Sequence, residues 1–306
     1  MPMRRASRKG ACVAEFMHDQ AEGLRRMLAG GRVRAVTVAG GRAGIGKTSV
    51  LINLAVALAR RGKYVMIIDE RADAGNVAGK LGLAPRYDLI DVISRKKQLE
   101  EVILHGPQGI AIMPAAKGVK ALSGMDSAGQ EWLVQAFSGL SQPVDVLLVD
   151  AGSGSGASAL SMSLASQEVV VVVSSQPASI TEAYALIKVM NQEFARRQFR
   201  IVVNKSGSEA EARAIYDNMA QAAGRFLDVS LEFMGHIPLD EKLRQAVRLC
   251  RPVVDAFPAA DSSRSFRQLA EVVEQWPCSR DDGGRLEGFM QRLIQNSRMA
   301  AQDLHF

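Results

Sequence analysis

The sequence predicts an α/β fold in which a mostly parallel central sheet is flanked by helices on both faces. Short apolar runs rich in β-branched residues alternate with longer helical segments, which is typical of parallel sheets covered by helices. Two of the runs, 146–149 and 169–173, contain no polar residue, as expected for central strands buried on both faces. The predicted strands lie at residues 35–38, 64–68, 110–113, 146–149, 169–173 and 201–203.

Size and composition are those of one large domain with short tails. The chain has 306 residues, of which 47% are hydrophobic, so it can bury a substantial core. No uninterrupted apolar run approaches the roughly 18–20 residues that a membrane-spanning helix needs. The basic residues within 1–10 are not followed by the apolar segment of a secretion signal. We therefore expect a soluble protein that is not exported.

Charge and cysteine content indicate a compartment but not a partner. The net charge of +6 favours anionic partners such as a nucleotide, a nucleic acid or an acidic membrane surface, without choosing among them. Cys12, Cys250 and Cys278 are far apart and odd in number, and their spacing is not that of a zinc site. They are expected to be reduced thiols, and the expected location is the cytoplasm.

The chain divides into three predicted regions. Residues 1–31 form an N-terminal arm, with a basic stretch followed by a short helix-like segment at 19–28. Residues 32–277 form the main domain. The sequence WPCSRDDGG at 276–284 then interrupts the helical periodicity, because it combines Pro and Gly with acidic residues. Residues 278–306 are expected to form a separate C-terminal amphipathic helix and tail.

The segment GRAGIGKT at residues 41–48 matches the phosphate-binding pattern G-x-x-x-x-G-K-[ST]. It follows the first predicted strand and precedes a predicted helix at 49–59, which is the context that this pattern requires. There, backbone N–H groups and the helix N-terminus hold phosphates, Lys47 supplies a charge and Thr48 ligates Mg²⁺. A glycine-rich turn alone would need neither Lys nor Thr. The residues predicted to bind ATP or ADP are Gly41, Arg42, Ala43, Gly44, Ile45, Gly46, Lys47, Thr48 and Ser49.

Two aspartates end predicted strands near this loop. Asp150 ends one strand, where its carboxylate can hold the water shell of Mg²⁺, and Asp69 ends the strand that follows the phosphate-binding helix. Ligands of α/β proteins gather at such strand ends. Either Asp alone is better explained as an ordinary polar strand end, but the shared context with a phosphate-binding loop favours a role in ligand binding. The glycine- and serine-rich run at 152–156 lacks dinucleotide-binding spacing and is interpreted as a switch loop that senses the terminal phosphate.

Several segments together resemble the MinD/ParA family of deviant P-loop ATPases over about residues 34–258. They read, in order, GGRAGIGKTS, VMIIDERADAGNVAGKLGL, VDVLLVDAGSG, SSQPASITEAYALIKVMN, IVVNK and GHIPLDEKLRQAV. Within this family SITEAYALIK, IPLDEKLRQAV and the N-terminal DQAEGLRRML are similar to the flagellar number regulators of the FlhG (FleN) branch. The resemblance implies an ATP-dependent homodimer that uses ATP or ADP with Mg²⁺ and controls flagellar number and assembly.

The resemblance also implies a partner for the arm. The flagellar regulators act with FlhF, a GTPase of the signal-recognition-particle type, and the matching residues here are Asp19, Gln20, Leu24 and Arg25. From the residues alone, Asp19 can cap a helix that carries Leu24, Met27 and Leu28 on one face, and such a helix can equally pack on its own domain. No specific nucleic acid is predicted. The alternative within the family is a partitioning or cell-division ATPase.

Asn204, at the end of the strand in IVVNK, resembles the family's adenine-recognising asparagine. Its amide offers a donor and an acceptor to a base, although Asn is also common where a strand turns.

Two departures from the family pattern concern catalysis. The family's signature lysine, which reaches the partner's phosphate across the dimer, falls at Arg42, and the next glycine falls at Ala43. Arg71 stands where a second aspartate normally orients the attacking water, so Asp73 or Glu70 would have to replace it. The predicted catalytic residues are Lys47, Arg42, Asp69 and Asp73, with slow turnover expected. A nucleotide-binding scaffold with little hydrolysis is a further alternative.

The C-terminal helix has an apolar stripe with the i, i+3, i+4, i+7, i+8 spacing of an amphipathic helix. Arginines at 285, 292 and 298 lie around the rest of its surface, which favours a peripheral contact with the inner face of the cytoplasmic membrane. The same stripe is equally typical of a helix that packs on a core. Its residues are Leu286, Phe289, Met290, Leu293 and Ile294.

Overall fold

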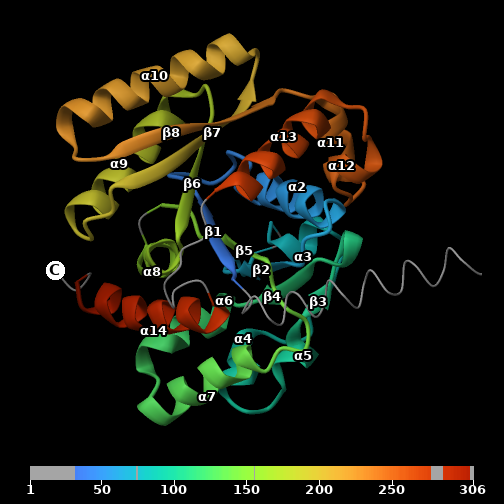
Figure 1. The fold of residues 1–306 in the computed structure, drawn as a ribbon, viewed down its shortest axis with the longest axis vertical. Helices are drawn as coiled ribbons and strands as arrows, with labels where there is room; N and C mark the ends of the chain where they lie inside the picture. Colours follow the sequence, from blue (N-terminus) through green and yellow to red (C-terminus); the bar gives the residue numbers. More distant parts are fainter. Residues whose placement is uncertain (1–31, 74, 155, 277–284, 304–306) are drawn as a thin grey trace, which may run out of the picture.

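A computed structural model describes residues 32–73, 75–154, 156–276 and 285–303. Its centre is an eight-stranded sheet in the order β3-β4-β2-β5-β1-β6-β7-β8 (Figure 1). Every described neighbouring pair is parallel except β3 and β4, which confirms the predicted fold class. The strands are β1 (Arg34–Ala39), β2 (Val65–Asp69), β3 (Leu104–His105), β4 (Ala111–Pro114), β5 (Val146–Asp150), β6 (Glu168–Val173), β7 (Gln198–Ser206) and β8 (Ser230–Pro238).

Helices cover both faces of the sheet, as the fully buried central strands require. They are α2 (Lys47–Arg60), α3 (Val77–Lys80), α4 (Leu89–Ile93), α5 (Leu99–Val102), α6 (Ala116–Ala121), α7 (Ser127–Ser138), α8 (Ala157–Ala165), α9 (Pro177–Gln192), α10 (Glu209–Phe226), α11 (Glu241–Arg248), α12 (Val253–Ala256), α13 (Asp261–Gln275) and α14 (Leu286–Asp303). Two 3₁₀ turns, η1 (Pro107–Gly109) and η2 (Leu122–Gly124), complete the described elements.

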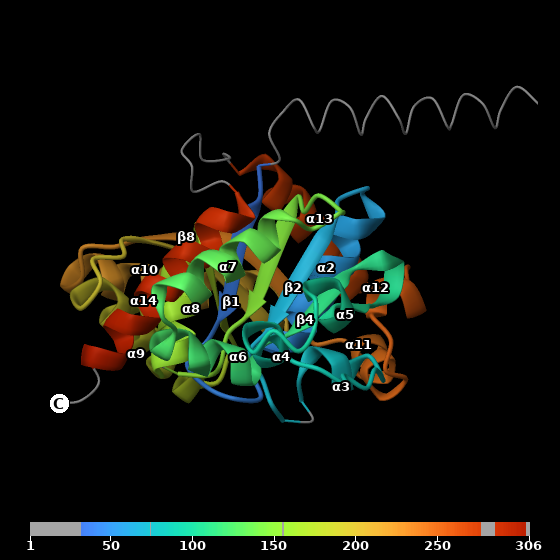
Figure 2. The same cartoon turned by 90° about the horizontal axis from the view of Figure 1, so that it is seen from below.

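Side-chain alternation along β1 separates the two halves of the core. Val36 and Val38 point to the face covered by α2, α12 and α13. Ala35 and Ala39 point to the opposite face, which α7, α8 and α14 cover near the middle of the sheet and α9 and α10 cover toward β7. Figures 1 and 2 show this three-layer arrangement.

Strand register brings the ends of β1, β2 and β5 to one edge of the sheet. Asp150 pairs with both Val38 of β1 and Asp69 of β2. The loops that leave these strands, 40–46, 70–76 and 151–156, therefore start side by side. This edge is where parallel α/β sheets bind ligands.

The apolar stripe of α14 is part of the core. Phe289, Met290 and Leu293 are fully buried, and Leu286 and Ile294 are nearly so, packed with residues of the sheet, α7 and α8. The helix lies against α7, α8 and η2 (Figure 1). Burial of such large apolar side chains is strongly favourable, which explains why the helix packs here.

In this structure α14 is not separate from the domain, and its stripe faces the core. Two of the three arginines around the stripe also contact the domain: Arg292 Nε donates to Ala165 O at 2.9 Å and Arg298 donates to Met125 O at 2.6 Å. A membrane contact through this stripe would require α14 to leave the core, and it stays a prediction. No helix in the described ranges is long and apolar enough to cross a bilayer.

Candidate functional site

The predicted phosphate-binding loop lies between β1 and α2 and depends on its glycines. Gly44 and Gly46 have φ angles of 83° and 98°, in the left-handed region that favours glycine. A Cβ on Gly41 would collide with the backbone of Glu182 in α9, so this position also needs glycine. Gly46 is the N-cap of α2 and no side chain caps the helix. The first turn of α2 is therefore suited to an anion.

A cavity of about 300 Å³ lies over this helix terminus. Its basic side chains come from four separate segments, and such a concentration of positive charge suits a polyphosphate. The lining residues are Arg42, Gly44, Ile45, Gly46, Lys47, Thr48, Ser49, Arg71, Gly75, Lys80 and Lys205. We call this cavity the phosphate pocket. Of the predicted loop residues, Gly41 and Ala43 are not in its lining.

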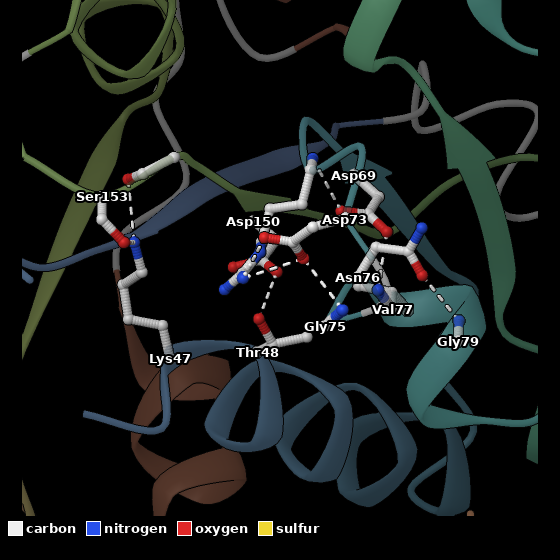
Figure 3. A network of polar contacts seen from close by, with 12 residues as sticks. Lys47, Thr48, Asp69, Asp73, Gly75, Asn76, Val77, Gly79, Asp150 and Ser153 are labelled. Atoms are coloured by element: carbon white, nitrogen blue, oxygen red, sulfur yellow. Dashed lines mark hydrogen bonds and ion pairs between the residues drawn. The ribbon is translucent and has the colours of Figure 1, made fainter. Parts of the chain in front are cut away.

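Lys47 links the phosphate-binding loop to the loop after β5. Its ammonium group donates to Ala151 O at 3.0 Å and to Gly152 O at 2.8 Å. It also donates to Ser153 Oγ at 3.1 Å (Figure 3). Burial lowers the pKa of Lys47 to about 8, and the negative charge of Asp150 opposes this shift. Phosphate oxygens would compete with these three acceptors for the same ammonium group.

Thr48 and Asp150 form a pair suited to Mg²⁺. Thr48 Oγ1 donates to Asp150 Oδ2 at 2.6 Å, whereas the buried Oδ1 of Asp150 has no hydrogen-bond partner within the described residues. Burial raises the pKa of Asp150, and the hydrogen bond from Thr48 and the charge of Lys47 oppose this. An unsatisfied buried oxygen beside a hydroxyl fits a cation, because Mg²⁺ is usually held by one or two protein oxygens plus phosphates and water.

The described part of the chain holds no cluster of three or more His, Cys, Asp or Glu residues that would form an all-protein metal site. Mg²⁺ at Thr48 and Asp150 would therefore depend on nucleotide phosphates for its remaining ligands.

Asp69 organises the loop after β2 rather than facing the phosphate pocket. Its Oδ1 accepts from Arg71 N at 3.1 Å and its Oδ2 accepts from Val77 N at 2.6 Å. Burial, followed by the charge of Asp150, raises the pKa of Asp69 to about 7. Asn76 caps α3 by accepting from Gly79 N at 2.6 Å, which further fixes the loop (Figure 3). In this structure Asp69 makes structural contacts with its own loop, and its catalytic role stays a prediction.

The two carboxylates expected to replace the missing aspartate are both engaged elsewhere. Asp73 accepts two hydrogen bonds from Arg71, at 2.9 and 2.7 Å, and its side chain is 64% exposed. Glu70 Oε2 accepts from Gly152 N at 2.8 Å. Neither residue lines the phosphate pocket, so in this arrangement neither one faces an attacking water there.

A larger cavity of about 530 Å³ continues from the phosphate pocket, since Gly46, Ser49 and Lys205 line both. We call it the base pocket because Asn204, predicted to recognise adenine, is in its wall. Its other lining residues are Pro238, Leu239, Asp240, Leu243, Arg244, Val247 and Arg248. The apolar members and the neighbouring polar groups are a combination typical of small-molecule sites.

Asn204 and Lys205 also hold the phosphate-binding loop in place. Asn204 Nδ2 donates to Ile45 O at 2.7 Å, and Asn204 Oδ1 accepts from Lys205 N at 3.0 Å. Lys205 Nζ donates to Gly44 O at 2.8 Å. Sequence reasoning missed Lys205, although its position directly after Asn204 was a usable signal. It also missed Lys80, and it considered Arg71 only as the residue that replaces the water-orienting aspartate.

Arg42, the residue at the signature-lysine position, lines the phosphate pocket and lies 3.9 Å from Glu182 of α9. Both side chains are partly exposed, at 41% and 43%, and the ion pair is long, so Arg42 can exchange this partner for another anion at little cost in free energy. Asp19, Gln20, Leu24 and Arg25 lie outside the described residues.

Another cavity, of about 340 Å³, lies at the opposite edge of the sheet, where β2 and β4 begin. Tyr64, Glu100 and His105 are in its wall, and it contains neither a glycine-rich loop nor a basic side chain of Lys or Arg. Its chemistry does not suit a phosphate, so the strand-end pockets remain the candidate site.

Comparison with known proteins agrees with this geometry. The CobQ/CobB/MinD/ParA nucleotide binding domain family matches residues 36–253. The chain is 42% identical over 264 residues to the antiactivator FleN of Pseudomonas aeruginosa, covering 86% of this chain and 94% of FleN. It is 26% identical to the flagellum site-determining protein YlxH of Helicobacter pylori, covering 87% of this chain and 91% of that protein.

A solved structure supports the fold. The septum site-determining protein MinD of Pyrococcus horikoshii, solved as a complex with Mg-ADP, aligns with a TM-score of 0.62 at 23% identity, covering 79% of this chain and 96% of that one. At this level of identity the likeness concerns the fold.

Proposed function

We propose that this chain, which belongs to the CobQ/CobB/MinD/ParA nucleotide-binding family and resembles FleN, is an ATP-dependent regulatory switch for flagellar number and assembly. The observation that carries the proposal is the continuous pair of pockets at the strand ends, one basic and one partly apolar. Their shared residues join a triphosphate site to a base site. The flagellar context rests on the similarity to FleN and YlxH.

Each part of the site has a distinct role in nucleotide binding. The first turn of α2 and Lys47 hold phosphates, and Asn204 lies where it can contact the base. Thr48 and Asp150 hold Mg²⁺, which neutralises phosphate charge when it is bound. Arg42 can contact the phosphate bound by a second copy of the chain once its side chain leaves Glu182. The active form is therefore proposed to be an ATP-dependent homodimer.

The switch is the loop that Lys47 holds after β5. When the ammonium group of Lys47 binds phosphates, its three hydrogen bonds to residues 151–153 are lost, and the loop after β5 can rearrange. That loop leads directly into α8, and α8 packs against α14. Nucleotide binding is thereby connected to the packing of α14, whose release would expose an apolar stripe for peripheral membrane contact.

Hydrolysis is proposed to be slow. Arg71 occupies the position of the usual water-orienting aspartate, Asp73 is paired with Arg71, and Glu70 is bound to Gly152. The same observation favours a second candidate function, a nucleotide-binding scaffold with little turnover. The two are separated by dimerisation, because a scaffold has one oligomeric state with or without ATP.

The partner is proposed to be the flagellar GTPase FlhF, bound through the arm residues Asp19, Gln20, Leu24 and Arg25. The experiment is GTP hydrolysis by purified FlhF with the full-length chain, with Gln20→Ala and with Arg8→Ala as a matched arm control. We expect stimulation by the full-length chain and by Arg8→Ala, and its loss in Gln20→Ala. Equal rates with and without the chain would refute the partnership and favour a partitioning or cell-division role.

The membrane contact is tested separately by flotation with anionic lipid vesicles. The intact chain should float more with ATP than with ADP, whereas a chain truncated after Gly284 should not float with either nucleotide. Equal flotation of both proteins would remove α14 from the proposal.

A further inference from the structure

Arg71 lines the phosphate pocket in the position where the family places an acid. Its side chain is only 21% exposed, and its backbone N donates to Asp69 Oδ1, so the buried end of β2 fixes the residue in place. Its guanidinium donates two hydrogen bonds to Asp73. The positive charge of Arg71 is therefore held in the wall of the phosphate pocket, which is proposed to bind an anion.

The charge of Arg71 acts on the groups that bind phosphate and metal. Burial is the main cause of the lowered pKa of Lys47, and the positive charge of Arg71 adds to it. The guanidinium also interacts electrostatically with Asp150 and Asp69. Arg71 thus shares one electrostatic environment with Lys47, and a phosphate bound by Lys47 would be attracted to both.

Sheet order indicates which phosphate Arg71 would meet. Asn204 and Lys205 come from β7, on one side of β1, and they line the base pocket. Arg71 follows β2, on the other side of β1, and lines only the phosphate pocket. A nucleotide with its base toward β7 crosses the loop after β1 and directs its terminal phosphate toward β2 and β5.

Asp73 is a replaceable partner for the guanidinium. Its carboxylate is mostly exposed, and exposed ion pairs contribute little to stability because water competes for both charges. A phosphate in the pocket carries more charge than Asp73 and offers oxygens that match the fork of an arginine. Exchange of Asp73 for phosphate therefore needs little energy.

We propose that Arg71 is a phosphate ligand supplied by the chain itself. Its guanidinium gives up the ion pair with Asp73 and binds the terminal phosphate, which makes the site selective for triphosphates over diphosphates. The inference rests on the proposed nucleotide site and adds the basis of its selectivity. Replacement of the acid by Arg71 then exchanges a group that promotes hydrolysis for one that retains the triphosphate.

The test is titration calorimetry with Mg²⁺ and either a non-hydrolysable ATP analogue or ADP. Arg71→Ala should weaken analogue binding by about tenfold or more, the loss expected for a charged hydrogen bond, and change ADP binding by less than about threefold. Arg86→Ala, which removes an exposed arginine outside both pockets, should change neither. Asp73→Asn should strengthen analogue binding, because it removes the competitor.

The outcomes are distinguishable. Equal weakening of analogue and ADP in Arg71→Ala, or no weakening, would overturn the role of Arg71 while leaving the nucleotide site intact. Absence of binding of either nucleotide to the unaltered chain would overturn both the site and this inference. If Arg71→Ala does not fold, Arg71→Lys and Asp73→Asn give the same comparison, with a reduced analogue preference expected for the lysine and an increased one for the asparagine.

Discussion

Phe289→Ala tests whether α14 belongs to the core. Phe289 is 0% exposed and packs within the cluster formed by the sheet, α7, α8 and α14. Truncating a buried Phe removes its transfer free energy and leaves a cavity, at a cost of about 3–5 kcal/mol. The free energy of unfolding, measured by urea titration without added nucleotide, should fall by that amount. Met299→Ala is the matched control, because Met299 lies on the same helix but is 52% exposed.

The control should change the free energy of unfolding by less than about 0.5 kcal/mol, as is usual for surface substitutions. A loss below about 1 kcal/mol in Phe289→Ala would contradict the burial of this side chain in the core. It would mean that α14 already leaves the core in the native protein, so that its stripe is free for another surface. Hydrogen exchange at α14 amides would then be faster than at α8.

Three further predictions concern the nucleotide pockets. Nucleotide affinity should fall as pH rises through about 8, because phosphate binds the charged form of Lys47 and the amine is neutral above its pKa. Calorimetry from pH 7 to 9 should show this fall in affinity, and Lys47→Arg should abolish the pH dependence. Asp150→Asn should abolish the difference in nucleotide affinity measured with and without Mg²⁺, because the carboxylate beside Thr48 is lost, and an unchanged difference would contradict the metal assignment. Gly46→Ala should abolish nucleotide binding and lower the free energy of unfolding by more than the roughly 1–2 kcal/mol of left-handed backbone strain, because the new Cβ also meets Asn204. Gly44→Ala is the control: its φ is 83° and there is open space around it, so the free energy of unfolding should fall only by the strain.

The sequence was sufficient for the parts of the fold set by local patterns. Each of the six predicted strands is present, because continuous β-branched runs require burial on both faces. Strands β3 and β8 were missed. The first has only two residues, and β8 lies at the sheet edge with a mixture of exposed and buried side chains, so neither has an apolar run.

The site was predictable where one segment carries its chemistry. The phosphate-binding loop follows from its own residues, and the structure gives it the expected strand and helix. Contacts between distant segments were not predictable, such as Asn204 with Ile45 or Lys47 with Gly152, because they depend on strand order. The stripe of α14 shows the same limit, since burial against a core and burial in a membrane need the same helical spacing.

An ATP-dependent switch must change its oligomeric state with nucleotide, and sedimentation of the full-length chain measures that state. The mass in solution is measured with no nucleotide, with Mg·ADP and with Mg·ATP, for the unaltered chain and for Lys47→Ala. We expect a monomer in the first two conditions, a dimer of twice that mass with Mg·ATP, and a monomer throughout for Lys47→Ala. A single mass of the unaltered chain in all three conditions would contradict an ATP-dependent switch.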